Sequence, residues 1–225
     1  MSISSTVEDA TSGHKQSMDR MYRLQRHIYD ATRAYYLLGR DQMIDRLQVP
    51  AGGSVLEIGC GTGRNLLRVA ERYPGCKLFG IDISDEMLKT ACVALGRHGS
   101  LGVLLAQADA TALDAGKNLG RNQFDRVYFS YTLSMVPEWS KALQHAATLL
   151  APGGELHVVD FGSCDGLPRL FKKSLYGWLK AFHVTPREDL ASVGREIAQA
   201  NGLIAETVRS HRGYAVHLRL SRPAT

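Results

Sequence analysis

The sequence has few cysteines and no long apolar run. Its four cysteines form no CxxC pair within 225 residues, so we expect reduced thiols rather than a disulfide framework. The first residues, rich in Ser and Thr, lack the apolar segment of a signal peptide, and no run of about 18 apolar residues is present to span a bilayer. The eight histidines show no ligand spacing, so we expect no metal. These absences predict a soluble, cytoplasmic protein.

Positive charge is concentrated in the last third of the chain. The net charge is +5, from 27 Lys and Arg against 22 Asp and Glu. Residues 1–160 hold 17 basic and 17 acidic side chains, whereas residues 161–225 hold 10 basic and 5 acidic ones. A local basic excess indicates an anionic partner such as a membrane surface, a nucleic acid or an acidic substrate.

Short apolar segments alternate with helical patterns between residues 54 and 161. This alternation is typical of βαβ units with a parallel sheet. Two further strands at the carboxyl end, joined by a turn at 211–213, predict a hairpin that adds an antiparallel edge. We expect strands at 54–58, 77–81, 103–107, 125–130, 155–161, 205–210 and 214–220, helices at 64–72, 85–97 and 141–149, and a loop around Gly116 and Gly120.

The domain organisation predicted from these patterns is simple. Residues 1–17 are polar and are expected to form a flexible tail. Residues 18–225 are expected to form a single domain. Two of its segments stand outside the strand–helix alternation: a helical segment at 18–49, which Gly39 divides, and an insert at 162–187.

The strongest local motif is the glycine-rich turn that follows the first predicted strand. Gly59, Gly61 and Gly63 alternate there, which allows a tight turn and a close approach of a ligand to the main chain. The dinucleotide fingerprint needs its third glycine at position 64, which is Arg64. Glu57 precedes the loop, and an acid at this place suits a cationic ligand better than a phosphate.

Acidic residues stand at the ends of the next two predicted strands. Asp82 follows the second strand, where a carboxylate can accept hydrogen bonds from both ribose hydroxyls. Asp109 follows the third strand, where it can accept a hydrogen bond from the exocyclic amine of a purine. Open α/β sheets bind ligands at this edge, so these groups are expected to share one crevice.

With these motifs the chain, from about residue 50 to 220, resembles the class I S-adenosylmethionine-dependent methyltransferases. The resemblance implies an α/β, Rossmann-like, seven-stranded and mostly parallel sheet with a reversed last strand. It also implies S-adenosyl-L-methionine as cofactor, with S-adenosyl-L-homocysteine as product. The residues that match the family's cofactor-binding motifs are Glu57, Gly59, Gly61, Gly63, Asp82, Ile83, Met87, Asp109, Ala110 and Ser130.

The helical segment at 18–49 is predicted to act as a lid over the cofactor. Tyr22, Tyr29 and Tyr36 lie seven residues apart and so share one helical face. They can close the crevice and face the sulfonium, although core packing explains the same stripe equally well. Arg40 can pair with a carboxylate of the cofactor or of the acceptor.

The insert at 162–187 combines apolar residues at helical spacing with four basic residues. An amphipathic helix with a basic face suits anionic lipid headgroups, although an ordinary surface helix over the sheet fits the pattern as well. Leucine and phenylalanine at helical spacing argue against nucleic acid as the partner. The predicted substrate-binding residues are Arg169, Lys172, Lys173, Trp178 and Arg187.

These two segments and the stretch 130–137 resemble the betaine-lipid N-methyltransferases. That resemblance implies methylation of the amine of diacylglyceryl-homoserine to the trimethylated lipid, at the inner face of an anionic membrane. Another lipid amine, such as phosphatidylethanolamine, or a small molecule is the alternative acceptor, and a cofactor-binding protein without transferase activity is a third hypothesis. Tyr131, His183 and His27 are the candidates to remove the amine proton, although a structural role accounts for each of them as well. The oligomeric state is left open.

Overall fold

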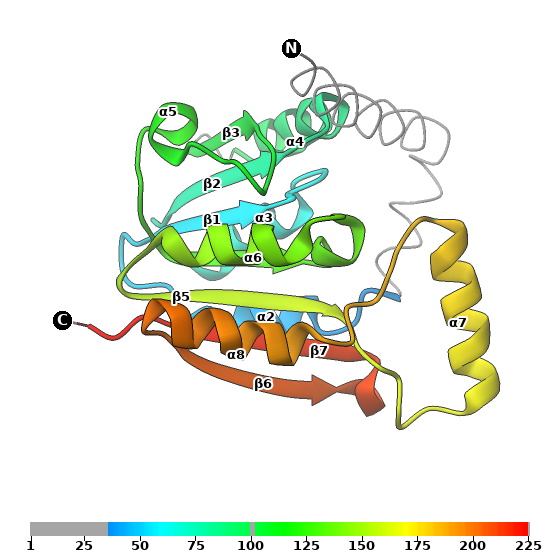
Figure 1. The fold of residues 1–225 in the computed structure, drawn as a ribbon. Helices are drawn as coiled ribbons and strands as arrows, with labels where there is room; N and C mark the ends of the chain where they lie inside the picture. Colours follow the sequence, from blue (N-terminus) through cyan, green and yellow to red (C-terminus); the bar gives the residue numbers. More distant parts are fainter. Residues whose placement is uncertain (1–35, 100–101, 225) are drawn as a thin grey trace, which may run out of the picture.

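The computed structural model describes residues 36–99 and 102–224, and its centre is one sheet of seven strands (Figure 1). The strand order is β3-β2-β1-β4-β5-β7-β6, and β7 runs antiparallel to both of its neighbours. The predicted seven-stranded sheet with its last strand reversed is therefore confirmed. The strands are β1 (Ser54–Ile58), β2 (Lys77–Asp82), β3 (Val103–Gln107), β4 (Phe124–Ser130), β5 (Leu150–Phe161), β6 (Ile204–Ser210) and β7 (Ala215–Ser221).

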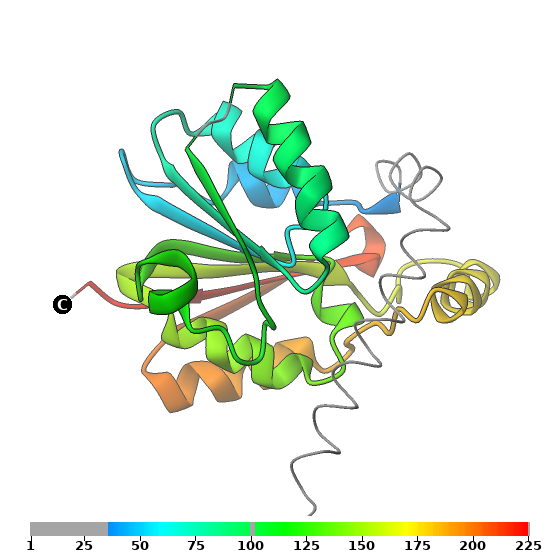
Figure 2. The ribbon, with the colours of Figure 1, turned by 90° about the horizontal axis from the view of Figure 1, so that it is seen from above.

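Helices cover both faces of the sheet (Figure 2). The central strands β1 and β4 are almost completely buried, which explains why they appear in the sequence as continuous apolar runs. One face packs against α2 (Arg40–Asp45), α3 (Arg64–Arg72) and α4 (Asp85–Arg97). The other packs against α5 (Ala115–Leu119), α6 (Trp139–Thr148) and α8 (Leu190–Asn201).

Two helices were missed by the prediction, and one strand begins earlier than predicted. The region expected to be a loop around Gly116 contains α5, which Asp114 caps by accepting a hydrogen bond from the amide of Lys117. Helix α8 was not predicted, although its inner face packs into the core. Strand β5 begins at Leu150, five residues early, because the Pro152–Gly154 turn bends within the strand instead of preceding it.

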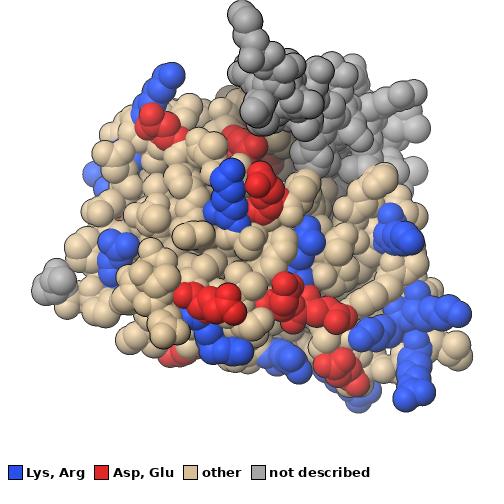
Figure 3. Space-filling view, in the orientation of Figure 1, with Lys and Arg blue, Asp and Glu red and all other residues tan. Residues whose placement is uncertain are grey.

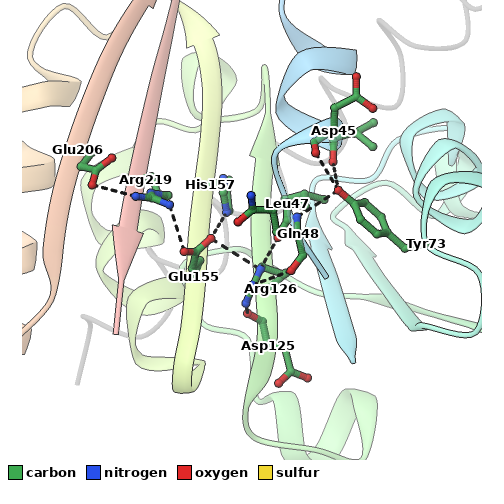
Figure 4. Close-up of polar contacts among 11 residues, drawn as sticks. Asp45, Leu47, Gln48, Tyr73, Asp125, Arg126, Glu155, His157, Glu206 and Arg219 are labelled. Atoms are coloured by element: carbon green, nitrogen blue, oxygen red, sulfur yellow. Dashed lines mark hydrogen bonds and ion pairs between the residues drawn. The ribbon is translucent and has the colours of Figure 1, made fainter. Parts of the chain in front are cut away.

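The segment before β1 is fixed to the sheet by buried polar contacts (Figure 4). Arg126 on β4 donates to the carbonyl oxygens of Leu47 and Gln48, which follow α2. The hydroxyl of Tyr73 accepts from the amide of Gln48 and lies 2.8 Å from the carbonyl oxygen of Ile44. Helix α2 therefore occupies a defined place at the edge of the crevice. Gly39, with φ +84°, begins it, as the predicted break required.

One helix stands apart from the layers. Helix α7 (Arg169–Ala181) lies beyond the carboxyl ends of the parallel strands in both ribbon views (Figures 1 and 2). It buries only Leu179 among its own residues. None of the helices in the described part of the chain has the length and apolar character that crossing a bilayer requires.

Candidate functional site

The glycine-rich turn between β1 and α3 is held close to its neighbours. Gly59, Gly61 and Gly63 all have positive φ, at 77°, 52° and 80°. A Cβ on Gly59 would overlap the side chain of Thr132, and a Cβ on Gly63 would lie 3.1 Å from that of Ala91. The turn therefore needs glycine at these positions, and it leads directly into the N-terminus of α3, where the first amides have no partner within the helix.

Asp82 connects this turn to the end of β2. Its Oδ2 accepts a hydrogen bond from the amide of Gly61 at 2.8 Å, and its Oδ1 accepts one from the amide of Ser84 at 2.9 Å. A carboxylate oxygen can accept more than one hydrogen bond, so these backbone contacts are compatible with a ribose hydroxyl at the same group. The predicted ribose-binding carboxylate is thus already oriented by the backbone on both sides.

The end of β3 lies beside the end of β2. The amide of Ala108 donates to the carbonyl of Asp82, and the side chain of Gln107 donates to the carbonyl of Ile83. Asp109 follows, and its Oδ1 accepts from both the amide and the hydroxyl of Thr111. The structure therefore brings the predicted ribose residues Asp82 and Ile83 beside the strand end that leads to Asp109 and Ala110, and Met87 follows as a buried residue in the first turn of α4.

Ser130 closes the crevice at the end of β4. It is 6% exposed, and its hydroxyl has no hydrogen-bond partner among residues 36–99 and 102–224. A buried hydroxyl without a partner costs stability, so its place at a strand end is consistent with a ligand that completes its hydrogen bonding. It neighbours Phe129, which pairs with Ile58 just before the glycine-rich turn.

Glu57 is enclosed in the protein beneath the same turn. It is 1% exposed, and its two oxygens accept from the side-chain amide of Asn65 at 2.8 Å and from the hydroxyl of Tyr128 at 2.9 Å. Burial raises the pKa of Glu57 to about 8, although these two hydrogen bonds and the charge of Arg40 act in the opposite direction. Direct contact of Glu57 with the ammonium group of a cofactor stays a prediction. Sequence reasoning missed the partners Asn65 and Tyr128.

An apolar pocket adjoins the crevice where the 36–38 segment, the loop after β4 and the end of β5 meet α7. Trp178 of α7 packs edge-on against Tyr36, with ring centroids 4.8 Å apart, and Phe161 packs in the same way against Tyr131 at 4.6 Å. Aromatic rings make up more than half of the walls. The lining residues are Tyr36, Leu37, Tyr131, Met135, Phe161, Trp178, Leu179, Phe182 and Val184.

Tyr131 is placed as a wall of this pocket and not as a base. It is 2% exposed and donates its hydroxyl to the carbonyl oxygen of Leu38 at 2.6 Å. Burial, together with the charge of Asp160, raises its pKa well above the usual range. A hydroxyl that is neutral and already donating is a poor proton acceptor, so this geometry disfavours the catalytic role predicted for Tyr131.

Two predicted acceptor-side residues come from the segment after α7. His183, with φ +57°, is exposed and stands between the pocket residues Phe182 and Val184. Arg187 donates to the carbonyl oxygens of Leu133 at 3.0 Å and Val136 at 2.8 Å. Arg187 thus fixes this segment against the loop after β4, and two of its N–H donors are engaged by main-chain carbonyls instead of a substrate carboxylate.

A buried acid that the sequence reasoning missed lies behind the pocket. Asp160 is fully buried at the end of β5, where it accepts hydrogen bonds from the amides of Ser134 and Phe161. Burial raises its pKa to about 6. Its position at the carboxyl end of a parallel strand is the signal that could have identified it.

The remaining predicted site residues are distributed as follows. Arg40 is buried, with its Nε 3.3 Å from the carbonyl oxygen of Leu37, and it acts electrostatically on Glu57 and Tyr131. Arg169 and Lys173 of α7 face solvent, outside the pocket. Tyr22 and Tyr29, with most of the predicted lid, lie outside the described residues. In the described part of the chain, no three His, Cys, Asp or Glu side chains are placed to hold a metal ion together.

Comparisons with known proteins agree with this geometry. Residues 55–154 match the family model described as a methyltransferase domain. These residues span β1 to the first part of β5 and include the glycine-rich turn, Asp82 and Asp109. Over 171 residues the chain is 33% identical to a ubiquinone/menaquinone biosynthesis C-methyltransferase of Salmonella paratyphi B, a match that covers 75% of this chain and 64% of the relative. The chain therefore spans somewhat less than two thirds of the length of that curated relative.

Solved structures show the same fold at low sequence identity. A phosphoethanolamine N-methyltransferase 2 of Haemonchus contortus matches with a TM-score of 0.71 at 17% identity, covering 93% of this chain and 60% of that one. A SAM-dependent methyltransferase of Aquifex aeolicus matches with a TM-score of 0.63 at 18% identity, covering 90% and 96%. The crevice residues of this methyltransferase domain fit S-adenosylmethionine: an acid for the ribose, an acid for the adenine and a buried hydroxyl without a partner.

Proposed function

We propose that this chain is an S-adenosylmethionine-dependent N-methyltransferase that methylates the amine of diacylglyceryl-homoserine to the trimethylated betaine lipid. The observation that carries the proposal is the pocket next to the crevice, in which five of the nine lining side chains are aromatic. The faces of aromatic rings attract ammonium groups, including quaternary ones, more strongly when water is excluded. The enclosed space is small, about 10 Å³, so an ammonium group would lie at the mouth of the pocket against these rings. Such a site suits an amine whose methylated products carry a permanent positive charge.

The residues of the crevice hold the donor and exclude water. When bound, S-adenosylmethionine supplies an electrophilic methyl group on a sulfonium. Asp82 orients the ribose and Asp109 the adenine, while the backbone of the 59–63 turn lies against the ligand. Positioning and water exclusion account for much of the acceleration of such a displacement, because the leaving thioether is uncharged.

The acceptor amine must lose a proton before each transfer. Among the described candidates, His183 suits this step better than Tyr131, because it is exposed beside two residues of the pocket whereas Tyr131 is buried and donating. We therefore assign proton removal to His183, with Tyr131 as a wall of the pocket.

A lipid acceptor is supported by α7, which forms one side of the pocket and carries basic and apolar side chains on its outer surface. The acyl chains of a lipid substrate would remain in the bilayer while its headgroup lies at the mouth of the pocket. Under this proposal the protein works peripherally at the inner, cytoplasmic face of an anionic membrane.

The relatives suggest competing acceptors. The Salmonella relative is by name a C-methyltransferase of quinone biosynthesis, and an aromatic pocket can also stack a hydroquinone ring. The Haemonchus structure is by name an enzyme of phosphoethanolamine, a water-soluble amine. A panel of acceptors separates these possibilities.

The test is a methylation assay with purified protein, S-adenosylmethionine and one acceptor at a time, read by mass spectrometry. The acceptors are diacylglyceryl-homoserine in detergent micelles, phosphatidylethanolamine in the same micelles, phosphoethanolamine and a prenylated hydroquinone. We expect successive addition of up to three methyl groups to the homoserine lipid, reduced in Trp178→Ala but not in Val93→Ala, an exposed apolar control on α4. Methylation of the hydroquinone or phosphoethanolamine alone would refute the lipid-amine assignment.

A further inference from the structure

Helix α7 exposes large apolar side chains to water. Leu170 is 84% exposed, Phe171 47% and Trp178 38%. Single exposed apolar residues are ordinary on protein surfaces, but three on one helix of 13 residues form a patch that needs an explanation. No contact among the described residues buries these three side chains, so core packing does not explain the patch.

The spacing along α7 separates its residues into three faces. The inner face, around Leu175 and Leu179, packs toward the body of the protein. The residues of the outer face have apolar or small side chains. A row of basic side chains, the basic strip, runs beside this face. The outer face consists of Leu170, Phe171, Ser174, Gly177, Trp178 and Ala181, and the basic strip of Arg169, Lys173 and Lys180, all of them exposed.

The basic strip is not neutralised by its own helix. The nearby acids are Asp165 and Glu188, and both lie 3.8 Å from Lys172, with Arg209 also 3.5 Å from Asp165. Within the described ranges, no ion pair involves Arg169 or Lys173. Figure 3 shows Lys and Arg gathered at the lower right of the molecule, where α7 lies in Figure 1.

We propose that α7 is an interfacial membrane anchor that lies in the plane of an anionic bilayer. Leu170 and Phe171 insert among the acyl chains, and Arg169 and Lys173 contact lipid phosphates. An amphipathic helix of this kind binds through buried apolar area plus attraction to anionic lipids. The inference rests on the proposed function and deepens it. The carboxyl half of the same helix supplies Trp178 and Leu179 to the pocket, so docking places the pocket at the bilayer surface.

This assignment changes the roles predicted for two residues. Lys172 was expected to bind headgroups, but it is 35% exposed, lies near two acids and stands 5.2 Å above the ring of Tyr176. It serves the attachment of α7 to the body. Lys172→Gln is therefore expected to weaken membrane binding less than Lys173→Gln.

The experiment is flotation of the full chain with vesicles of phosphatidylcholine alone or mixed with phosphatidylglycerol. We expect the mixed vesicles to bind the protein, and the double variant Leu170→Asp/Phe171→Asp to lower the partition coefficient roughly tenfold or more. Arg169→Glu/Lys173→Glu is expected to lower the partition coefficient by a similar factor, but only for the vesicles that contain phosphatidylglycerol. The matched controls are Val93→Asp/Leu104→Asp, which charges two exposed apolar residues elsewhere, and Lys77→Glu/Lys117→Glu.

All the changed residues of α7 are exposed, and circular dichroism with thermal unfolding confirms that each variant is folded. Equal binding by the α7 variants and their controls, or no binding by the wild type, would overturn the anchor. Quenching of tryptophan fluorescence by brominated lipids adds a second readout, because Trp178 lies on the outer face whereas Trp139 is only 8% exposed. Absence of quenching on bound protein would also overturn it.

The anchor and the proposed function fail in different ways. Methylation of the homoserine lipid in detergent micelles does not require the anchor, so micellar activity without vesicle binding would remove only the anchor. Vesicle binding that depends on Leu170 and Phe171, with no lipid amine methylated, would remove the proposed function and leave the anchor in place.

Discussion

Asp82 is the residue on which the donor site depends most. It joins the glycine-rich turn to the start of α4 through two backbone hydrogen bonds, which orient the carboxylate at the end of β2. Asp82→Ala is expected to weaken binding of S-adenosylmethionine by roughly one to two orders of magnitude, as the loss of charged hydrogen bonds implies. Isothermal titration calorimetry measures this effect, with Asp85→Ala on α4 as the control. An unchanged affinity would exclude the ribose assignment.

Glu57 gives the protein a characteristic pH dependence. Its pKa in the folded state is about 8, above the ordinary value of 4.5, so between these values the folded protein holds a proton that the unfolded chain has released. Unfolding then releases a proton, and the free energy of unfolding falls as the pH rises through this window. Asp160, with a pKa raised to about 6, acts in the same direction at lower pH.

Replacing Glu57 tests this account. In Glu57→Gln the decrease in unfolding free energy between pH 5 and pH 8 is expected to be smaller by roughly 1–4 kcal/mol, since each unit of pKa shift corresponds to about 1.4 kcal/mol. Urea unfolding at the two pH values measures it. The exposed Glu138→Gln should leave the wild-type slope intact, and an identical slope in Glu57→Gln would contradict the account.

His183 and Tyr131 are expected to respond differently to substitution. His183→Gln should lower kcat, because the imidazole accepts the amine proton. Tyr131→Phe should retain most of the rate and lower stability by about 1 kcal/mol, since only the hydrogen bond to Leu38 is lost. Methylation rates, with thermal unfolding of each variant, distinguish the two roles. An unchanged kcat in folded His183→Gln would exclude it as the base.

At the residue scale, the sequence identified candidate site residues from their positions at strand ends. It did not show which of the candidates are buried. Asp82, Asp109 and Ser130 lie together because parallel strands end at one edge, which the pattern alone implies. The sequence did not predict that Tyr131 is buried or that Arg187 donates to main-chain carbonyls. Both features depend on how the loop after β4 packs against other segments of the chain.

A buried arginine of the sheet holds the residues that follow helix α2. Arg126 is 7% exposed and donates to the carbonyl oxygens of Leu47, Gln48 and Asp125, with Glu155 at 3.7 Å (Figure 4). Arg126→Met is expected to cost about 3 kcal/mol of unfolding free energy, because the buried carbonyl groups lose their donor, whereas Glu155 keeps His157 and Arg219. Denaturant unfolding measures this loss.

A matched variant near the same helix shows how much unfolding free energy is lost when only an exposed ion pair is removed. Arg72→Met removes an exposed ion pair with Asp45, whose side chains are 57% and 62% exposed, and is expected to cost less than about 1 kcal/mol. Equal losses in the two variants would show that the buried contacts of Arg126 do not hold α2. Because residues just before α2 line the pocket, we also expect Arg126→Met to raise KM for the acceptor.

Elements with a strong apolar pattern in the sequence were predicted correctly, whereas elements with a weak pattern, such as α8, were missed. Strands β1 to β4 follow continuous apolar runs, so their bounds differ from the prediction by one residue at most. Helix α8 carries small residues, including Gly194, whose Cβ position would lie within 2.8 Å of Leu218. Close packing of a small residue is set by the tertiary structure and leaves little signal in the sequence.

At the scale of the whole molecule, the donor site and the basic surface lie on different parts of the chain. Residues up to Asp160 are neutral in sum and supply the crevice, and the net charge of +5 comes from the residues after it. Within that region the structure separates two roles: Arg187 and Lys172 hold segments together, whereas Arg169 and Lys173 face solvent. The sequence predicted the location of the surplus, and only the fold divides it between internal and external contacts.

The central claim is methylation of a lipid amine, and lipid mass spectrometry of cells supplied with diacylglyceryl-homoserine tests it most directly. Cells that express this chain are expected to accumulate the mono-, di- and trimethylated lipids, whereas cells that express Asp82→Ala should retain mainly the unmethylated lipid. If the homoserine lipid stays unmethylated while the folded protein binds S-adenosylmethionine, the account of the acceptor is contradicted.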